Sequence, residues 1–158
     1  MAKKKKDIQP DSTIAVNRKV RHEYSLEKFF EAGLVLQGWE VKSIRAGKAN
    51  ISEAYIILKN GEAWIIGSQF VPLLSASTHV VAEANRTRKL LLHQSELNQL
   101  VAAVERQGYT IVPLKLFWKN GRVKCDLAIA KGKKLHDKRQ SIKDREWQRS
   151  KARVLKRN

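Results

Sequence analysis

The chain has 158 residues and carries 32 lysines and arginines against 15 acids, which gives a formal net charge of +17 at pH 7. This length suits one domain with a real core and excludes two large ones. So positive a chain attracts polyanions; nucleic acid is the first partner that it indicates, and an anionic membrane is the second. Its single cysteine, Cys125, excludes an internal disulfide framework and indicates a buried thiol in a reducing compartment.

The charge divides the chain into three parts. Residues 131–158 hold twelve bases and three acids, whereas residues 25–130 hold thirteen and nine. The N-terminus begins with a basic run, but no apolar run follows it as a signal peptide requires, and no apolar run is long enough to span a membrane. We therefore expect a cytoplasmic protein with a disordered basic arm over residues 1–12, a globular domain over 13–130 and a basic tail over 131–158.

Two short strands are expected near the start of the domain, over residues 13–17 and 31–37. The segment between them, NRKVRHEY, groups cations, an amide, an imidazole and a phenol: Asn17, Arg18, Lys19, Arg21, His22 and Tyr24. Cations bind phosphates, and the two rings can stack on unpaired bases, as recognition of single-stranded RNA requires. A solvated turn with Tyr24 anchored in the core is an equally acceptable interpretation.

Further basic residues lie near two expected helices. A short helix over residues 39–47, ended by Gly47, has two candidate RNA contacts near its end, Arg45 and Lys48. The segment ANRTRKLLLH presents three more directly before the second helix: Arg86, Arg88 and Lys89. A charge run of this kind is more often a solvated face than a binding site, and both interpretations stay open.

The second helix is expected over residues 93–108. Four apolar residues recur at i, i+3, i+4 and i+7 and share one face: Leu97, Leu100, Val101 and Val104. Ser95 is the expected N-cap, and Gly108 is the expected stop after the last turn.

Two Asn-Gly pairs predict hairpins, because a type I′ turn needs positive φ at both central residues. The hairpin over residues 53–70 turns at Asn60-Gly61 and pairs Ile57 with Trp64; both faces are apolar, so we expect cover on both sides. The hairpin over residues 113–130 turns at Asn120-Gly121. Its register runs outward through these pairs: Lys119–Arg122, Trp118–Val123, Phe117–Lys124, Leu116–Cys125, Lys115–Asp126 and Leu114–Leu127. This register makes one face apolar and the other wet and basic.

The expected elements add up to about six strands and two or three short helices, a mostly β fold. A closed, OB-like antiparallel barrel removes exposed strand edges most economically and is the expected architecture. A β-sandwich is the alternative.

An enzyme has little support in the sequence. The four histidines form no His-x-x-x-His pair and no Cys-x-x-Cys pair exists, so neither a metal site nor a cofactor is expected. Phosphate-binding and nucleophile-elbow motifs are also missing. Glu31 and Glu40 could in principle lie in a cleft as paired carboxylates. The favoured interpretation is a strand-end charge and a solvated helix residue.

The basic tail has no apolar stripe that could cover a core or a membrane. On a helical wheel Leu135 and Ile142 share a face, but Trp147 and Val154 point about 120° away from them. Crowded like charges keep such a segment disordered in water, whereas a phosphate-lined channel neutralises them. We therefore expect the tail to be disordered when free and helical against RNA.

Five segments, in order and at matching spacing, resemble the family of small protein B (SmpB), the bacterial proteins that bind transfer-messenger RNA. They are NRKVRHEY, FEAGLVLQGWEVKSIRAGKANI, RTRKLLLH, VPLKLFWKNGRVKCDLAIAKGKK and HDKR. The resemblance covers nearly the whole chain from about Ile14. The sequence departs at Val20, Trp39 and Gln140, where the family pattern favours alanine, a smaller residue and an acid.

The resemblance implies an OB-like barrel without catalytic activity, bound one-to-one to the tRNA-like domain of transfer-messenger RNA. It also implies delivery of that RNA, with elongation factor Tu, to ribosomes stalled with no codon in the A site. By matching position, the RNA-binding surface includes Asn17, Arg18, Lys19, His22, Glu31, Leu91, Lys124 and Gly132, to which we add Lys131, Lys133 and Lys134.

The tail is implied to enter the empty mRNA channel of the small ribosomal subunit. His136 would stack near the decoding bases, and Asp137, Lys138 and Arg139 would form the region between hinge and helix. Trp147 is expected to make a stacking or wedging contact. The alternative is that it occupies a position of the helix without any contact role. Two other function classes stay open: a generic ribosomal or nucleoid protein, and an enzyme such as a nuclease.

Overall fold

The computed structural model describes residues 12–73, 82–106, 108–133, 139, 143 and 145–150. In chain order the elements are β1 (Thr13–Val16), α1 (Val20–Glu23), β2 (Tyr24–Leu34), α2 (Gly38–Arg45), β3 (Ala49–Asn50), β4 (Tyr55–Lys59), β5 (Glu62–Ile66), β6 (Gln69–Phe70), β7 (Arg88–Leu91), α3 (Gln94–Val104), β8 (Tyr109–Lys119) and β9 (Arg122–Gly132). Residues 139, 143 and 145–150 of the tail are helical, and the disorder expected of the free tail stays a prediction. No helix in these described ranges is long and apolar enough to cross a membrane.

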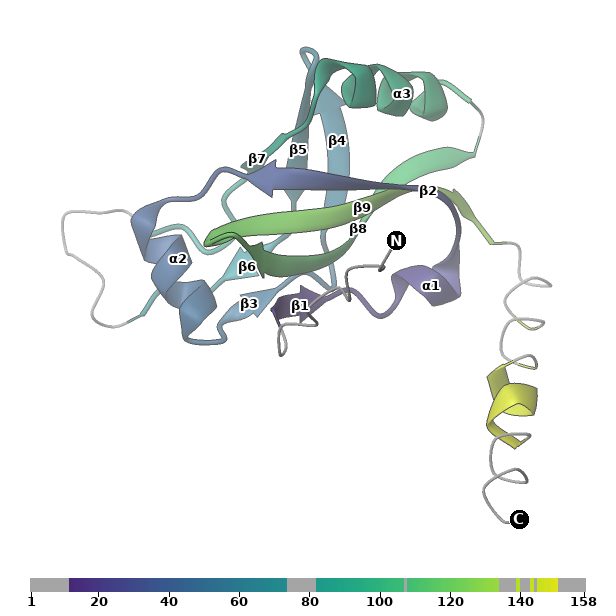
Figure 1. Cartoon of the computed structure of the whole chain (residues 1–158), viewed down its shortest axis with the longest axis horizontal. Helices are drawn as coiled ribbons and strands as arrows, with labels where there is room; N and C mark the ends of the chain where they lie inside the picture. The colour runs from purple at the N-terminus through teal and green to yellow at the C-terminus, as the bar shows by residue number, and fades with distance from the viewer. Residues whose placement is uncertain are drawn as a thin grey trace, which may run out of the picture.

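Seven strands form one antiparallel sheet in the order β1-β8-β9-β2-β7-β5-β4, and β3 pairs with β6 in a separate ribbon. The fold is mostly β, as predicted, but among the described residues β1 and β4 do not pair, so the sheet is not closed and the expected barrel is not confirmed (Figure 1). The sheet curls until β4 lies close to β8 across the core. The register of β1 is irregular between Thr13 and Ala15, and a bulge twists an edge strand away from further pairing.

The long hairpin of β8 and β9 has the predicted register from its turn out to Lys115 opposite Asp126. Beyond that pair the prediction is wrong, because a bulge at Leu114 places Pro113, rather than Leu114, opposite Leu127. Proline has no N–H to donate to the ladder, so a bulge beside it is expected physically. The strand also continues through Gly132, past the expected domain boundary.

The shorter hairpin of β4 and β5 also has its predicted pairs, including Ile57 opposite Trp64. Asn60 and Gly61 have φ values of 53° and 71°, as the turn requires. Cover on both faces is only partly confirmed. Ile56 and Ile65 are buried, whereas Tyr55 is 51% exposed.

Alternation along the long strands builds the main core. Phe30, Ala32 and Leu34 of β2 point inward with Leu116 of β8 and Leu127 of β9. Helix α2 adds Trp39, which is 7% exposed and donates from Nε1 to Gln37 Oε1 at 2.7 Å, so the large ring at this position is a core residue. The buried state expected of the Cys125 thiol is confirmed.

Helix α3 has its N-cap earlier than predicted and ends before the expected range does. Its N-cap is His93 rather than Ser95, and Glu96 completes a capping box with the His93 backbone. The helix ends at Val104, and Gly108, with a φ of 82°, lies in the link to β8. Helix α2 agrees with the prediction and is followed by Gly47 at a φ of 74°. The first half of β2, α1 and β7 were not predicted.

A second, smaller cluster lies apart from the main core. Val20 of α1 packs with Val112, Ala128 and Ala130 of β8 and β9, and Tyr24 packs against their edge. This cluster fixes the short helix α1 to the sheet. It also supports the anchored interpretation of Tyr24, which is half-buried.

Candidate nucleic-acid interface

The outer face of the sheet collects side chains from β2, β7 and β9. Antiparallel pairing sets Gly33 opposite both Leu91 and Lys124, and Glu31 opposite Asp126. Side chains of successive strand residues alternate between faces, so these residues share one face. Glu31, Leu91 and Lys124, which the family resemblance assigns to RNA binding, therefore meet around Gly33.

A hollow of about 410 Å³ opens where these residues meet. It is lined by Glu31, Gly33, Leu91, Leu92, His93, Glu96 and Lys124. Gly33 has no side chain, and this leaves space between Leu91 and Lys124. A Cβ added at Gly33 would lie 3.3 Å from Leu91 Cβ and 3.7 Å from Lys124 Nζ. Leu91 is 52% exposed and offers an apolar contact at the edge of this otherwise mostly polar hollow. We name this site the Gly33 hollow.

Glu31 explains how an acid can belong to a surface for a polyanion. Lys119 Nζ donates to both carboxylate oxygens of Glu31 at 3.1 Å. Beside it, burial raises the pKa of Asp126 above its ordinary value, and the Lys115 ammonium, 3.8 Å away, only partly opposes that rise. Glu31 therefore holds a cation over the face and leaves little net negative charge there. Lys119 was not predicted as part of the site.

The segment before β2 presents the second group of cations. Arg18, Lys19 and Arg21 are exposed on or beside α1, and His22 is half-buried. Lys19 pairs with Glu53 at 2.7 Å, but both side chains are well exposed, and an exposed pair leaves a cation available to another partner. His22 Nδ1 lies 3.2 Å from Arg145 Nη2 of the tail helix.

Asn17 differs from its neighbours because it is only 6% exposed. Its Oδ1 is buried and has no hydrogen-bond partner among the described residues. An unpaired buried acceptor is costly, so this atom suits a donor from a bound molecule.

The start of the tail lies beside α1. Gly132 pairs with Tyr24, and the Lys133 backbone N–H donates to Glu23 O at 2.9 Å. The Lys131 ammonium lies 5.6 Å from the centre of the Tyr109 ring. The described part of the tail adds Arg139 and Trp147, the latter 70% exposed. Lys134, His136, Asp137 and Lys138 lie outside the described residues.

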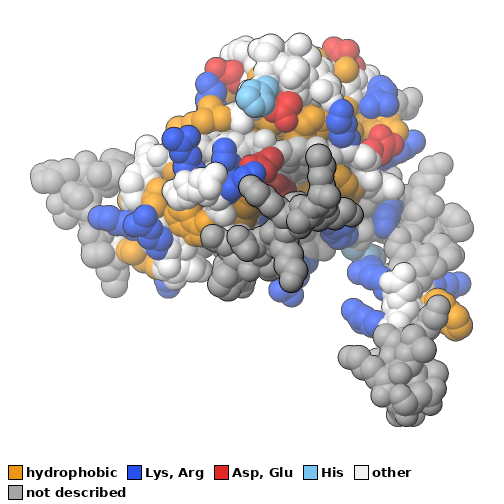
Figure 2. Space-filling model, in the orientation of Figure 1, with side chains coloured by type: hydrophobic (Ala, Val, Ile, Leu, Met, Phe, Trp, Pro, Cys, Tyr) orange, Lys and Arg blue, Asp and Glu red, His pale blue; other side chains and the backbone are white. Residues whose placement is uncertain are grey.

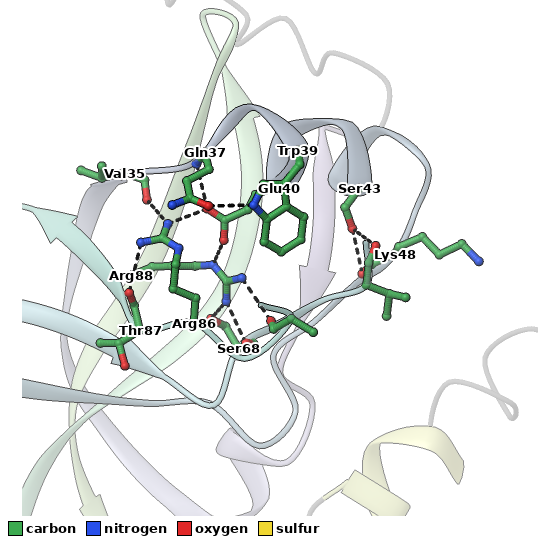
Figure 3. A network of polar contacts seen from close by, with 12 residues as sticks. Val35, Gln37, Trp39, Glu40, Ser43, Lys48, Ser68, Arg86, Thr87 and Arg88 are labelled. Carbon is green, nitrogen blue, oxygen red and sulfur yellow. Dashed lines mark hydrogen bonds and ion pairs between the residues drawn. The ribbon is translucent and has the colours of Figure 1, made fainter. Parts of the chain in front are cut away.

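The three cations over residues 86–89 all pair with acids of the protein itself. Arg88 is fully buried; its Nε donates to Glu40, and its Nη1 donates to Ser68 O and Oγ at 2.9 and 3.0 Å (Figure 3). Arg86 donates to the other Glu40 oxygen at 2.5 Å, and Lys89 pairs with Glu62 at 2.9 Å. The expectation that Arg88 lies on an RNA-facing surface is therefore wrong, because it has no exposed surface.

Glu40 was expected to be a solvated helix residue, and that is also wrong. Its side chain is fully buried and accepts from both arginines and from the Gln37 backbone N–H at 2.7 Å. Burial, the largest effect, raises its pKa, but the hydrogen bonds from Arg86, Gln37 and Arg88 together hold that pKa below the ordinary value. Glu31 and Glu40 bind different cations rather than each other, so they form no carboxylate pair.

Arg45 and Lys48 are both exposed near the end of α2. The Arg45 guanidinium lies 5.9 Å from the centre of the Trp118 ring, which lines a hollow adjoining Gly33. Figure 2 shows lysine and arginine side chains spread among exposed hydrophobic ones over one face of the domain. Within the described ranges, no group of three or more His, Cys, Asp or Glu side chains could hold a metal ion.

Comparison with known proteins agrees with this arrangement. A family model described as SmpB protein matches residues 14–157. The chain belongs to the SmpB family. It is also similar to a chain of a solved structure described as "tmRNA-SmpB: a journey to the center of the bacterial ribosome". The two are 39% identical with a TM-score of 0.62, and the match covers 76% of this chain and 84% of the other.

Proposed function

We propose that this SmpB-family chain binds the tRNA-like domain of transfer-messenger RNA and delivers it to stalled ribosomes for trans-translation. It acts as a non-enzymatic adaptor, a monomer in the cytoplasm that works with elongation factor Tu. Family membership and the likeness to a tmRNA-SmpB structure support this proposal.

The observation that carries the proposal is the Gly33 hollow. Leu91 is far from Glu31 in sequence, and Lys124 is farther still, yet the strand pairing brings all three to one rim. A hollow with an exposed leucine, a lysine and an imidazole suits an unpaired nucleotide, which needs apolar contact for its base and positive charge for its phosphate.

The cations beside α1 extend this surface. Arg18, Lys19 and Arg21 are exposed at one end of the same sheet, and Lys131 lies on the neighbouring strand β9. Phosphate contacts from such cations position an RNA without reading its sequence. Recognition of an RNA by its tRNA-like shape needs this combination of spread positive charge and a few shaped hollows.

A competition experiment tests RNA choice. A labelled tRNA-like domain is bound to the protein and challenged with an excess of bulk RNA of the same length. The proposal predicts that bulk RNA competes weakly; equal competition would favour a generic basic ribosomal protein, the second function that the net charge of +17 supports. Six to ten phosphate contacts predict that affinity falls by about 10³–10⁵ between about 50 and 200 mM salt.

The tail is proposed to act at the ribosome rather than in RNA capture. A truncation after Lys133 keeps β9 and the Lys133–Glu23 backbone hydrogen bond. This truncated protein is expected to retain most of its affinity for the tRNA-like domain. It is expected to lose trans-translation on stalled ribosomes, measured as the tagging of the unfinished protein chain. Full tagging by the truncated protein would contradict the role of the tail, while leaving RNA binding by the domain intact.

A further inference from the structure

A second hollow, of about 390 Å³, lies on the sheet at the end nearest α1. Its lining includes Asn17, Arg18, Arg21, Phe29 and Lys115, and none of its lining residues belongs to the Gly33 hollow. The NRKVRHEY motif supplies Asn17, Arg18 and Arg21, but no motif of the sequence pointed to Phe29, which lies in the half of β2 that was not predicted. We name it the Phe29 hollow.

Phe29 is the unusual member of this site. It is 55% exposed in the middle of a long strand, although its neighbour Phe30 is buried in the core at 7% exposed. Across the ladder it faces Ala128, whose small side chain leaves the ring uncovered. An exposed ring in a concave site, with Val16 and Leu114 beside it in the lining, offers an apolar face to a bound molecule.

Cations line the same hollow as this ring. Arg18 and Arg21 are exposed, and Lys115 is half-buried. The one acid in the lining, Asp126, lies 3.8 Å from the Lys115 ammonium, so the hollow keeps a positive balance. The combination of a ring and several cations is complementary to a nucleotide, whose base presents a π-face and whose phosphate is negative.

Asn17 adds a polar group that lacks a partner. Its Oδ1 is buried in the wall of the hollow and accepts no hydrogen bond within the described part of the chain. The Asn17 side chain could therefore rotate so that its Oδ1 faces the hollow without breaking a hydrogen bond of Oδ1 in the described part of the chain. A base amino group or a ribose 2′-hydroxyl would supply the missing donor.

We propose that the Phe29 hollow binds one unstacked nucleotide of the transfer-messenger RNA, with its base stacked on Phe29 and its phosphate held by Arg18 and Arg21. This inference rests on the proposed function and adds a second contact point to it. Transfer-messenger RNA is favoured over a ribosomal strand because the Phe29 hollow opens on the same sheet as the Gly33 hollow. An RNA bound at the Gly33 hollow therefore extends toward the Phe29 hollow.

The test compares three variants in a binding assay with the tRNA-like domain. Phe29→Leu removes the stacking face but keeps an apolar side chain, Phe29→Tyr keeps the ring, and Tyr55→Leu is the control, since Tyr55 is a similarly exposed ring on β4. Loss of one stacked base predicts that Phe29→Leu binds about 5- to 150-fold more weakly. Phe29→Tyr and Tyr55→Leu are expected to bind like the unmodified protein.

The salt dependence separates stacking from charge. Phe29→Leu is expected to keep the slope of affinity against salt, whereas Arg18→Gln reduces that slope by about one phosphate contact. Thermal unfolding of each variant checks that the domain is intact. Because Phe29 is exposed, its replacement by leucine is expected to leave the melting temperature nearly unchanged.

Several outcomes would overturn the inference. Equal RNA affinity of Phe29→Leu and Tyr55→Leu would mean that the ring stacks on no base of this RNA. Unchanged RNA affinity with lost tagging would assign the hollow to a ribosomal strand instead. If the unmodified protein showed no preference for the tRNA-like domain, the proposed function itself would fail, and the two failures are therefore distinguishable.

Discussion

Removing the charge of Glu40 tests how the fold holds the strands that carry the proposed RNA-binding surface. Glu40 accepts from Arg86 and Arg88, and both carboxylate oxygens are buried. Glu40→Gln keeps the shape but leaves two arginines without their counter-charge, one of them fully buried. Breaking a buried pair by removing one partner costs about 3–5 kcal/mol in the free energy of unfolding. For a chain of this size that corresponds to a melting temperature lower by about 6–20 °C.

Urea unfolding followed by tryptophan fluorescence measures this change. The matched control is Glu53→Gln, because Glu53 also pairs with a cation, Lys19, but at an exposed site, and no measurable change is expected there. A free energy of unfolding for Glu40→Gln within error of the Glu53→Gln value would refute the reasoning. Such a result would mean that the free-energy cost of burying the charges of Glu40, Arg86 and Arg88 cancels the attraction between them.

The pH dependence follows from the lowered pKa of Glu40. A carboxyl whose pKa is lower in the folded state stabilises the fold fully above its ordinary pKa, and this contribution is lost as the pH falls through the folded value. The difference in stability between the unmodified protein and Glu40→Gln is therefore expected to be constant near neutral pH and to shrink in acid. A difference that grew on acidification would contradict this assignment.

Three further predictions concern the hollow, its lysine and the thiol. Gly33→Ala pushes on Leu91 and is expected to weaken RNA binding, whereas Gly38→Ala, whose Cβ meets nothing within 4 Å, leaves it unchanged in the same titration. Lys124→Gln is expected to weaken binding and to reduce the salt slope by about one, unlike Lys59→Gln, because Lys59 lines neither hollow. Equal salt slopes for Lys124→Gln and the unmodified protein would remove Lys124 from the interface. Burial raises the pKa of Cys125 to about 12, so the folded protein is expected to resist iodoacetamide at pH 8 and to react in urea; rapid native labelling would show an accessible thiol.

The sequence predicted the structure best where local chemistry decides it. The Asn-Gly turns place both hairpins, and alternation beside the second turn gives the correct register as far as Lys115. The register failed at Pro113, where the missing N–H and the bulge override alternation. The first half of β2 was missed because charged side chains such as Glu27 and Lys28 interrupt its pattern, and its strand conformation comes from pairing with β9.

The candidate site divides in the same way. The cations Arg18, Lys19 and Arg21 are exposed, as both interpretations of their segment predicted, and their binding of RNA stays a prediction. Arg88 looked equivalent in sequence, and only the tertiary contact with Glu40 shows that it is internal. The roles of Gly33 and Lys119 depend on which strands pair, since their neighbours Leu91 and Glu31 come from distant segments. Such pairings are not visible in local sequence patterns.

NMR mapping of the tRNA-like domain onto the protein tests directly whether this face of the sheet binds the RNA. Backbone amide shifts are followed while the unlabelled RNA is added. We expect the largest changes around Gly33, Leu91 and Lys124, with further changes toward Arg18 and Phe29. Changes confined to α3 and the β4–β5 hairpin, with these residues unaffected, would contradict it.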